Sequence, residues 1–383
     1  MKMPSQKSSG SPFQAWRSGK IIQRLLQNIK NETTHLKSPL RIMEVCGTHT
    51  MTLHRFGLKP LLREAGIEMI SGPGCPVCIT PDYYHELMID LVTGHKDIIL
   101  CTFGDMTRVP TKKGALQTVV PHQASRINIV YSPEEALALA QKNPDKQVIF
   151  FGAGFETTIP SIAYTVKKAR AEGIKNYSIF SALWLIPPAL EAIISSGEIR
   201  LDGFIYPGHV SVIIGTRPYR FVAEKYGLPG AIAGFEPADI LLALLSVVRQ
   251  VKYGKPEVAN EYQRAVTEEG NLQAQSLMEE MLEEYDADWR GLGIIRRSGL
   301  KLREEFAEFD ALKRFNLRLQ PSRRVKITHR PACRCGEVLK GLVRSEECPL
   351  FGKACTPDSP QGPCMVSYEG ACLIEFKYSS RGF

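Results

Sequence analysis

Short apolar segments alternate with segments of helical periodicity from Leu40 to about Gln250, and this alternation is the strongest constraint on the fold. The apolar segments lack the in–out alternation of a half-exposed sheet, which is typical of parallel strands buried on both faces. The expected strands are Arg41–Val45, Ile67–Ile70, Asp97–Cys101, Ile127–Tyr131, Gln147–Phe151, Tyr177–Ser181, Gly203–Tyr206 and Gly230–Ala233. The expected helices are Thr50–Glu64, Asp82–Thr93, Pro133–Gln141, Pro160–Glu172 and Pro187–Ser196. This order predicts an α/β fold with parallel sheets covered by helices on both sides.

The chain is predicted to divide into four regions. The turn at Gln141–Lys146 is interpreted as a seam between two similar α/β units, and beyond Glu257 the sequence is expected to be helical and charged through Asp288. From Pro331 it is rich in Gly, Pro and Cys. We therefore predict an N-terminal extension over residues 1–36, α/β domain I over 37–143, α/β domain II over 144–255, and a helical, Cys-rich domain over 256–383.

Composition excludes several classes of protein. With 44% hydrophobic and 23% charged residues, the chain is not a disordered, collagen-like or coiled-coil protein. The net charge of +8 is a mild excess that we interpret as solvated surface, so no nucleic-acid partner is expected. No apolar run reaches the ~20 residues of a membrane-spanning helix, and the polar N-terminus lacks a secretion signal. We expect a cytoplasmic protein with no membrane partner.

Reactive side chains follow six of the eight expected strands, each beside a glycine. Ligands bind at the carboxyl ends of strands in open parallel sheets, so these segments predict a functional cleft. Turns explain the glycines but not a Cys, His, Asp or Glu beside nearly every one. The segments are Cys46-Gly47-Thr48-His49-Thr50, Gly72-Pro73-Gly74-Cys75-Pro76-Val77-Cys78, Thr102-Phe103-Gly104-Asp105-Met106, Gly154-Phe155-Glu156-Thr157-Thr158, Pro207-Gly208-His209-Val210-Ser211 and Gly234-Phe235-Glu236-Pro237.

Cys46 is expected between the end of a strand and the start of a helix. The helix dipole and free N–H groups favour a thiolate there, and a thiolate is a nucleophile or a ligand for a soft metal. His49 lies one turn further along the chain. It is interpreted either as a second ligand or base, or as a helix-capping or core histidine.

Cys75 and Cys78 form a C-x-x-C motif just before an expected helix. This context favours a dithiol/disulfide couple, although the same spacing is also half of a zinc site. The helix is expected to stabilise the thiolate of Cys75 more than that of Cys78, so Cys75 should be the more reactive thiol. The surrounding Gly and Pro residues are typical of an exposed turn. Cys101, inside an apolar strand, is expected to be a small core residue.

Six further cysteines lie within forty residues of the C-terminal region. Their wide spacing provides no paired C-x-x-C knuckles, so a zinc ribbon is disfavoured. Thiolates from distant turns of a Gly- and Pro-rich segment are typical of a [4Fe–4S] cluster, which needs four of the six. The cysteines are Cys333, Cys335, Cys348, Cys355, Cys364 and Cys372.

Taken together, the strand-end motifs and the Cys-rich tail resemble the HypD family of [NiFe]-hydrogenase maturation (expression/formation) proteins. The resemblance extends from about Leu40 to Tyr378. It implies two Rossmann-like α/β domains facing a cleft and a small Cys-rich iron–sulfur domain with helical elements. It also implies a cytoplasmic assembly factor that pairs with a HypC-type chaperone and meets a HypE-type donor, which presents cyanide as a thiocyanate. Together these proteins build the Fe(CN)2CO unit of the hydrogenase.

The resemblance also implies roles for individual residues. Cys46 would ligate the nascent iron, and Cys75 and Cys78 would be a redox dithiol or further iron ligands. The [4Fe–4S] cluster would be held by four of Cys335, Cys348, Cys355, Cys364 and Cys372. The candidates for orienting diatomic ligands and moving protons are Asp105, Arg108, Glu156, His209 and Glu236. Such a protein is an assembly scaffold with redox activity rather than a conventional turnover enzyme.

Two rival interpretations use only part of these residues. A stand-alone thiol–disulfide oxidoreductase linked to an iron–sulfur cluster explains Cys75, Cys78 and the tail, but leaves Cys46 and the second α/β unit without a role. A non-catalytic zinc-binding scaffold explains only the tail cysteines.

Overall fold

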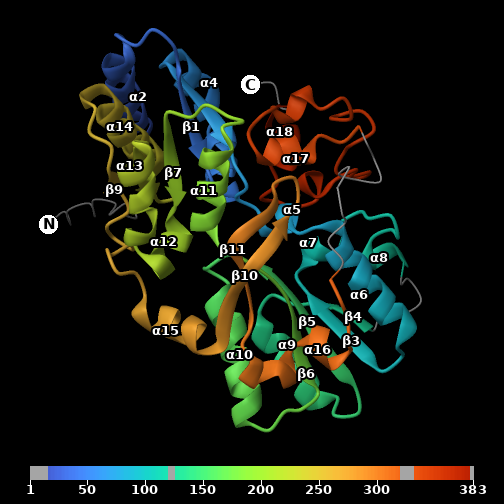
Figure 1. Ribbon diagram of the computed structural model, residues 1–383. Coiled ribbons are helices and arrows are strands. Elements are labelled where there is room, and N and C mark those ends of the chain that lie inside the picture. The colour runs from blue at the N-terminus through green and yellow to red at the C-terminus, as the bar shows by residue number, and fades with distance from the viewer. Residues whose placement is uncertain (1–15, 120–125, 320–331, 380–383) are drawn as a thin grey trace, which may run out of the picture.

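Two mostly parallel β-sheets form the body of the protein in the computed structural model, which describes residues 16–119, 126–319 and 332–379 (Figure 1). Sheet A has five parallel strands in the order β2–β1–β7–β8–β9. They are β1 (Leu40–Glu44), β2 (Ile67–Ser71), β7 (Gly203–Pro207), β8 (Gly230–Ala233) and β9 (Val258–Asn260).

Sheet B has six strands in the order β10–β11–β6–β5–β3–β4. Strands β3 to β6 are parallel, and the antiparallel hairpin β10–β11 extends the sheet beyond β6. The strands are β3 (Ile98–Thr102), β4 (Ile127–Ile129), β5 (Gln147–Gly154), β6 (Tyr177–Trp184), β10 (Leu282–Trp289) and β11 (Gly293–Leu302). The α/β class with parallel sheets is thus confirmed.

All eight expected strands are present as β1 to β8, with ends that differ by at most a few residues. Every residue of β7 is buried, as is every residue of β5 except Gln147. Because both faces of these strands are covered, their sequences show continuous apolar runs rather than alternation.

The seam predicted at Gln141–Lys146, with domain I ending at residue 143 and domain II starting at 144, does not coincide with the sheets. Strands β3 and β4 precede it, yet they lie in sheet B beside β5. Strand β7 follows it, yet it pairs with β1 in sheet A. Each sheet therefore takes strands from both halves of the chain. The turn at the predicted seam only connects α9 (Pro133–Lys142) to β5, because parallel strands need not be neighbours in sequence.

Most of the expected helices are also present. Four of them are α6 (Asp82–Gly94), α9 (Pro133–Lys142), α10 (Ile159–Ala171) and α11 (Ile186–Ser196). The fifth, expected over Thr50–Glu64, is two helices, α3 (Gly47–Arg55) and α4 (Leu58–Glu64). Gly57 separates them with a φ of 61°, a left-handed conformation that glycine adopts without steric cost.

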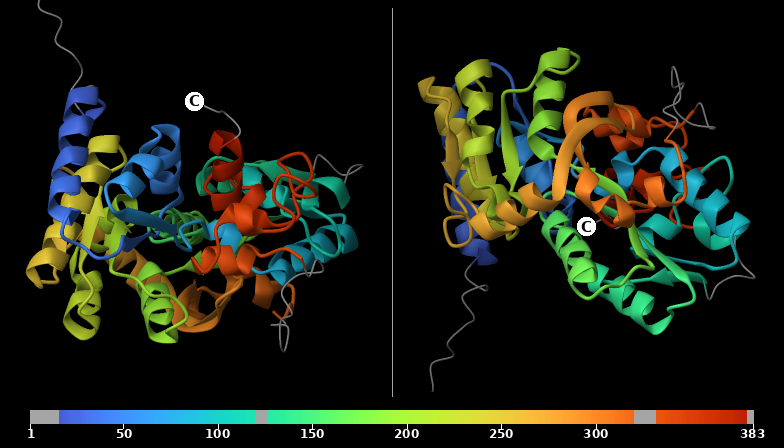
Figure 2. Two further views of the ribbon diagram at one scale, coloured as in Figure 1. Left: turned by 90° about the horizontal axis from the view of Figure 1, so that it is seen from above. Right: turned by 60° about the horizontal axis from the view of Figure 1, so that its bottom comes forward.

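Shorter or unforeseen helices complete the two α/β units. They are α2 (Gly19–Thr33), α5 (Pro76–Ile79), α7 (Gly104–Thr107), α8 (Leu116–Val119), α12 (Gly208–Ile214), η2 (Arg217–Tyr219), α13 (Arg220–Tyr226), α14 (Pro237–Tyr253), α15 (Leu272–Met281), η3 (Glu304–Phe309) and α16 (Ala311–Arg314). Helix α2, in the predicted N-terminal extension, lies beside α14 (Figure 2) and buries Leu25 and Ile29.

The helical prediction beyond Glu257 holds only for α15 and is wrong for the rest: residues 258–260 form strand β9, residues 261–271 contain no helix, and residues 282–288 belong to strand β10. Helix α15 ends at Met281, and β10 begins at Leu282 and pairs with β11. Leu282, Ala287 and Trp289 are buried, whereas most of the charged residues between them are partly or fully exposed. A bulge between Tyr285 and Ala287 interrupts the alternation of buried and exposed side chains that marks a strand. The charged residues are therefore interpreted, from sequence alone, as the exposed face of a helix.

The Cys-rich tail packs against both α/β units. It contains α17 (Cys335–Leu339), η4 (Ser345–Glu347), η5 (Pro363–Met365) and α18 (Ala371–Ser379). Helix α18 lies against α3 of the sheet A unit, and η5 lies against α5. The tail therefore reaches the carboxyl ends of the strands, where the expected reactive residues lie.

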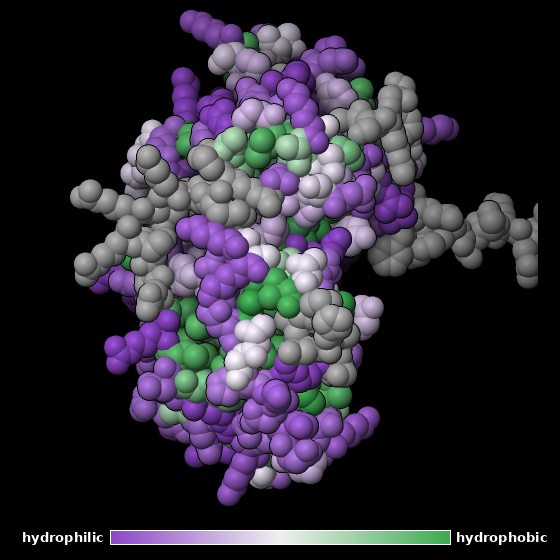
Figure 3. Space-filling model, turned by 90° about the vertical axis from the view of Figure 1, so that its right-hand side faces the viewer, coloured by the Kyte–Doolittle hydropathy of each residue, from purple (hydrophilic) through white to green (hydrophobic). Residues whose placement is uncertain are grey.

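Among the described residues, no helix is both long and apolar enough to cross a membrane. The face of the molecule drawn in Figure 3 is largely hydrophilic, with hydrophobic residues in small groups between polar ones.

Candidate functional site

Cys46 lies where strand β1 gives way to helix α3, as the sequence predicts, and its side chain is buried. Its backbone N–H donates to a carboxylate oxygen of Glu44 at 3.0 Å, and the Thr50 hydroxyl donates to the other oxygen. Burial raises the pKa of Glu44 to about 7, although these hydrogen bonds oppose the shift. Glu44, which sequence analysis missed, therefore fixes the loop that carries Cys46.

The expectation that the helix start makes Cys46 a thiolate is not met in the unliganded protein. Burial and the nearby carboxylate of Glu369 raise the pKa of the Cys46 thiol. Helix α3 is only nine residues long, and its favourable field does not offset this desolvation. A metal ion that binds Cys46 would have to displace its proton.

His209 is the nearest predicted partner of Cys46. It lies at the start of α12, directly after β7, and its Nδ1 is 3.6 Å from the Cys46 sulfur. The two residues meet because β1 and β7 are neighbours in sheet A. Burial lowers the pKa of His209 to about 4, so the imidazole is neutral at pH 7.

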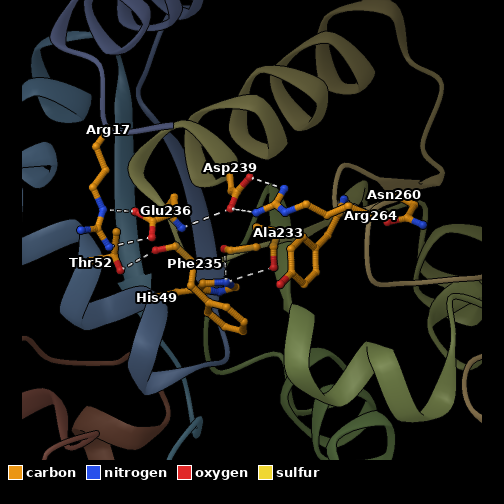
Figure 4. A network of polar contacts seen from close by, with 11 residues as sticks. Arg17, His49, Thr52, Ala233, Phe235, Glu236, Asp239, Asn260 and Arg264 are labelled. Atoms are coloured by element: carbon orange, nitrogen blue, oxygen red, sulfur yellow. Dashed lines mark hydrogen bonds and ion pairs between the residues drawn. The ribbon is translucent and has the colours of Figure 1, made fainter. Parts of the chain in front are cut away.

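His49 connects α3 to the end of β8 (Figure 4). Its Nε2 lies 2.9 Å from the carbonyl oxygen of Gly234 and 3.3 Å from that of Ala233. Carbonyls only accept hydrogen bonds, so Nε2 carries the proton. Burial lowers the pKa of His49 to about 4, and Nδ1 is buried with no hydrogen-bond partner among the described residues. These contacts match the core-histidine interpretation.

The C-x-x-C loop packs directly against the Cys46 loop. The Gly47 N–H donates to the Gly74 carbonyl at 3.3 Å, and a Cβ on Gly74 would lie 2.4 Å from the Cys46 nitrogen. The Cys75 sulfur accepts the Cys78 N–H at 3.2 Å. Cys75 and Cys78 are 2% and 0% exposed, so the prediction of an exposed turn is wrong. The tail packs against this loop through η5.

The prediction that Cys75 is the more stabilised thiolate is also wrong. Burial disfavours both thiolates and, with the neighbouring Cys78, raises the pKa of Cys75. At Cys78, burial is outweighed by hydrogen bonds from Cys364 and Cys75 and by the Arg290 cation, which lower its pKa to about 6. Helix α5 has only four residues, so its dipole is too weak to decide the order.

Glu369, in the tail, was missed by sequence analysis. It lies near the thiols of Cys46, Cys75 and Cys78. Its backbone presses on Gly47, where an added Cβ would lie 2.4 Å from the Glu369 carbonyl oxygen. The Thr48 hydroxyl donates to its carboxylate at 3.5 Å. Burial, with the charges of Cys78 and Asp105, raises the pKa of Glu369 to about 7. The carboxylate in turn raises the pKa values of the Cys46 and Cys75 thiols.

Asp105 and Arg108 hold the tail rather than line an open cleft. Arg108 donates to the Val366 carbonyl at 2.9 Å and pairs with Asp105 at 2.9 Å. Asp105 accepts the Tyr368 N–H at 3.2 Å. These contacts fix the segment immediately before Glu369.

Glu156 and Glu236 have structural partners away from the thiols. Glu156 accepts the Ile186 N–H at 2.9 Å and fixes the start of α11. Its second oxygen is buried with no partner among the described residues, and burial raises its pKa to about 7. Glu236 caps α14 and accepts a hydrogen bond from Arg17 at 2.7 Å (Figure 4). Cys101, as expected, is buried in the core.

The tail cysteines line a single small apolar cavity. The Cys335 and Cys364 sulfurs are 2.8 Å apart, and the Gln361 N–H donates to the Cys355 sulfur at 3.3 Å. A Cβ on Gly362 would lie 3.0 Å from the Cys333 sulfur, so this position has little room for a side chain. The cavity is lined by Cys333, Cys335, Val338, Cys348, Phe351, Cys355, Gly362, Cys364, Met365 and Cys372.

The chemistry of this donor set is compatible with an iron–sulfur cluster. Within the described ranges, no three His, Cys, Asp or Glu side chains are arranged to hold one metal ion. A cubane needs a different arrangement, because each thiolate binds a separate iron around a shared inorganic core. Soft thiolates in an apolar cavity suit that chemistry.

Comparisons with known proteins find relatives over nearly the whole chain. The family model "HypD: Hydrogenase formation hypA family" matches residues 20–379. The hydrogenase maturation factor HypD of Cupriavidus necator is 41% identical over 373 residues, 96% of each chain. The hydrogenase expression/formation protein HupD of Azotobacter chroococcum is 43% identical over 369 residues, 95% of each chain.

Two further matches were found. The hydrogenase maturation factor HypD of Escherichia coli is 40% identical over 368 residues, 95% of this chain and 96% of the relative. Of the solved structures, D-threo-3-hydroxyaspartate dehydratase from Delftia sp. HT23 aligns with 78% of this chain and 86% of its own at 12% identity. Its TM-score of 0.15 is too low to inform the fold.

Proposed function

Because the chain belongs to the HypD family of hydrogenase formation proteins, we propose that it is an assembly scaffold for the active site of [NiFe] hydrogenases. It holds the iron of the Fe(CN)2CO unit on cysteine thiolates and supplies electrons for cyanide transfer. The observation that carries this proposal is the meeting of Cys46, Cys75, Cys78 and Glu369 where the strand ends and the tail converge.

The iron is the cargo of this site, and Cys46 is its principal ligand. Low-spin ferrous iron with cyanide and carbon monoxide prefers soft thiolates. The neutral imidazole of His209, 3.6 Å from the Cys46 sulfur, accepts the proton that the thiol must lose when iron binds. Cys75 and Cys78 act as a dithiol or as further iron ligands.

Cyanide transfer requires two electrons, because a thiocyanate R–S–CN must become a thiolate and cyanide. Oxidation of the Cys75 thiol and the Cys78 thiolate to a disulfide supplies two electrons and releases one proton. Glu369, whose pKa is about 7, accepts this proton and passes it to the donor thiolate.

The tail supplies the means to restore the dithiol. Four of Cys335, Cys348, Cys355, Cys364 and Cys372 would hold a [4Fe–4S] cluster, which when bound supplies single electrons. Cys364 lies in this cavity and is also close enough to Cys78 to lower the pKa of its thiol. The C-x-x-C pair and the tail thiols are therefore neighbours.

We propose a cytoplasmic protein whose partners are a HypC-type chaperone and a HypE-type cyanide donor, with no nucleic-acid or membrane partner. Infrared spectroscopy of the anaerobic complex with the chaperone tests this function, since iron-bound cyanide and carbon monoxide absorb where proteins do not. Cys46→Ala should abolish these bands. Cys101→Ala, a matched control in the core of sheet B, should retain them. Bands that persist in Cys46→Ala contradict the assignment of Cys46.

Metal analysis tests the cluster separately. The anaerobic protein should be brown and contain about four irons and four sulfides per chain. Single Cys→Ser changes at the true ligands should bleach it, whereas Cys46→Ser should not. A colourless protein loaded with zinc would favour the zinc scaffold instead. Catalytic reduction of insulin by the isolated protein would favour the stand-alone thiol–disulfide oxidoreductase.

A further inference from the structure

Arg290 is a buried cation that the proposed function does not use. It occupies the turn between β10 and β11, and its side chain is only 4% exposed. Its guanidinium donates twice to the Thr80 carbonyl, at 2.6 and 3.1 Å, and its backbone N–H donates to the Ile79 carbonyl at 2.7 Å. Both carbonyls directly follow Cys78 in the chain, so Arg290 is anchored to the end of the C-x-x-C helix.

The next residue anchors the same turn to the tail. Gly291 has a φ of 82°, and a Cβ there would lie 2.4 Å from the Gly336 Cα. Gly336 directly follows Cys335 in α17. The turn is thus wedged between the helix that carries Cys78 and the helix that carries Cys335. A side chain at Gly291 would push the turn and the helix that carries Cys335 apart.

The charged and titratable groups around Arg290 leave it facing the thiols. Its one ion-pair partner is Asp82, at 2.6 Å and 20% exposed, within the described ranges. His85 also faces Arg290, and burial together with this cation keeps its imidazole neutral. The remaining groups within electrostatic range are the Asp288 carboxylate on β10 and the thiols of Cys78, Cys335 and Cys364. A buried arginine is costly to desolvate, and here the Asp82 carboxylate and the Thr80 carbonyl offset that cost and hold the cation in place.

We propose that Arg290 is a positioning residue that raises the reduction potentials of both the Cys75–Cys78 couple and the tail cluster. The proposal rests on the electron supply in the proposed function. Reduction of the disulfide by two electrons yields thiols or thiolates, and reduction of a bound cluster by one electron adds one negative charge. A fixed cation in a low-dielectric junction stabilises the more negative state in each case. Removal of the cation should therefore make both centres harder to reduce.

Two potentials measure the effect in the full-length protein. The disulfide equilibrium of Cys75 and Cys78 is measured in cluster-free protein against dithiothreitol buffers, by alkylation and mass spectrometry. The cluster potential is measured in loaded protein by titration with dithionite, the external one-electron donor, and electron paramagnetic resonance. Arg290→Gln should lower each reduction equilibrium constant about tenfold. That corresponds to about 59 mV for one electron and about 30 mV for two.

Charge and structure are separated by two further variants. Arg290→Lys keeps the cation and should retain most of both potentials. Asp82→Asn removes the opposing carboxylate and should raise both, a direction that loss of structural support does not predict. This variant also keeps the test decisive if Arg290→Gln fails to fold.

Arg314→Gln is the matched control. Arg314 is another partly buried arginine, but it donates to Tyr177 and Gln147 at the amino ends of β6 and β5. The thiols lie at the carboxyl ends of the strands, so this variant should leave both potentials unchanged. If Arg290→Gln and Asp82→Asn change neither reduction equilibrium constant by more than about twofold, the proposal is overturned. Wild-type protein without a cluster signal would count against the proposed function, while the disulfide equilibrium would still test Arg290.

Discussion

Replacing Gly47 by alanine tests whether the tail presses on the Cys46 loop. The added Cβ would lie 2.4 Å from the Glu369 Cβ and carbonyl oxygen and 2.7 Å from its Cα. Real Cβ atoms do not approach so closely, and two of the three contacted atoms belong to the backbone. The strain therefore cannot be relieved by moving the end of a flexible side chain. Either α3 or the tail segment must shift.

The expected cost follows from this geometry. Overpacking of a tight contact typically destabilises a protein by about 1–3 kcal/mol. The intrinsic preference of a helix for alanine over glycine returns at most about 1 kcal/mol. We therefore expect a net loss of about 1–2 kcal/mol in the free energy of unfolding. Glu369 should also move away from Thr48 and Cys46, with a loss of iron-bound cyanide and carbon monoxide of at least about tenfold, as a 1 Å misplacement of a reacting group can cause.

The assay combines urea unfolding with infrared spectroscopy of the chaperone complex. Gly94→Ala is the control, because Gly94 ends α6 with no atom within 4 Å of the added Cβ, and its stability should be unchanged or slightly higher. Glu369→Gln preserves the packing but removes the acid, so it should lose the infrared bands with little loss of stability. If Gly47→Ala has wild-type stability within about 0.5 kcal/mol and wild-type bands, the inferred contact between tail and loop is wrong.

Two further predictions concern proton binding. The pKa of Cys78 is lowered whereas that of Cys75 is raised, so in cluster-free protein Cys78 should react with iodoacetamide faster than Cys75, as measured by mass spectrometry; equal rates in the folded protein would contradict this order. Burial raises the pKa of Glu156 to about 7, so the folded state binds this proton more tightly than the unfolded chain, and stability is lost as the pH rises from about 4.5 to 7. Glu156→Gln avoids that loss and should exceed wild-type stability by up to about 3 kcal/mol at pH 8, with no advantage near pH 4; an advantage that does not depend on pH would show that ionisation is not its cause.

The strands were predictable because each is a short apolar run whose residues are mostly buried on both faces. Their grouping into sheets was not. Strand β3 pairs with β5, as Leu100 opposite Ile149 illustrates, and β1 pairs with β7, which lies some 160 residues further along. No local property of these segments records such a choice. It depends on the packing of whole helices and strands that are distant in sequence.

The candidate site was likewise predictable only where its residues follow expected strands. Cys46, Cys75 and His209 were found because they follow strands, and parallel strands bring their carboxyl ends to one edge. Glu44 was missed because it lies inside a strand, where an acidic residue has no periodic signature. Glu369 was missed because it lies in a tail without periodicity. The glycine that follows it, Gly370, is a sequence feature that could have indicated a tightly packed segment. In the structure a Cβ at Gly370 would lie 2.2 Å from the Cys364 carbonyl oxygen.

The tail connects two groups of candidate residues that are far apart in the sequence, the tail cysteines and the Cys46 loop. Cys364 and Cys372 line the small apolar cavity of the tail cysteines, and Glu369 lies between them in the chain. Because metal binding and folding are coupled, ligation of the tail thiols by a cluster would also order the intervening segment. That segment is fastened at its start by Asp105 and Arg108, and it presses on Gly47 at its end. Under the proposed function, loss of the cluster would therefore remove the acid from the Cys46 site as well as the electron supply.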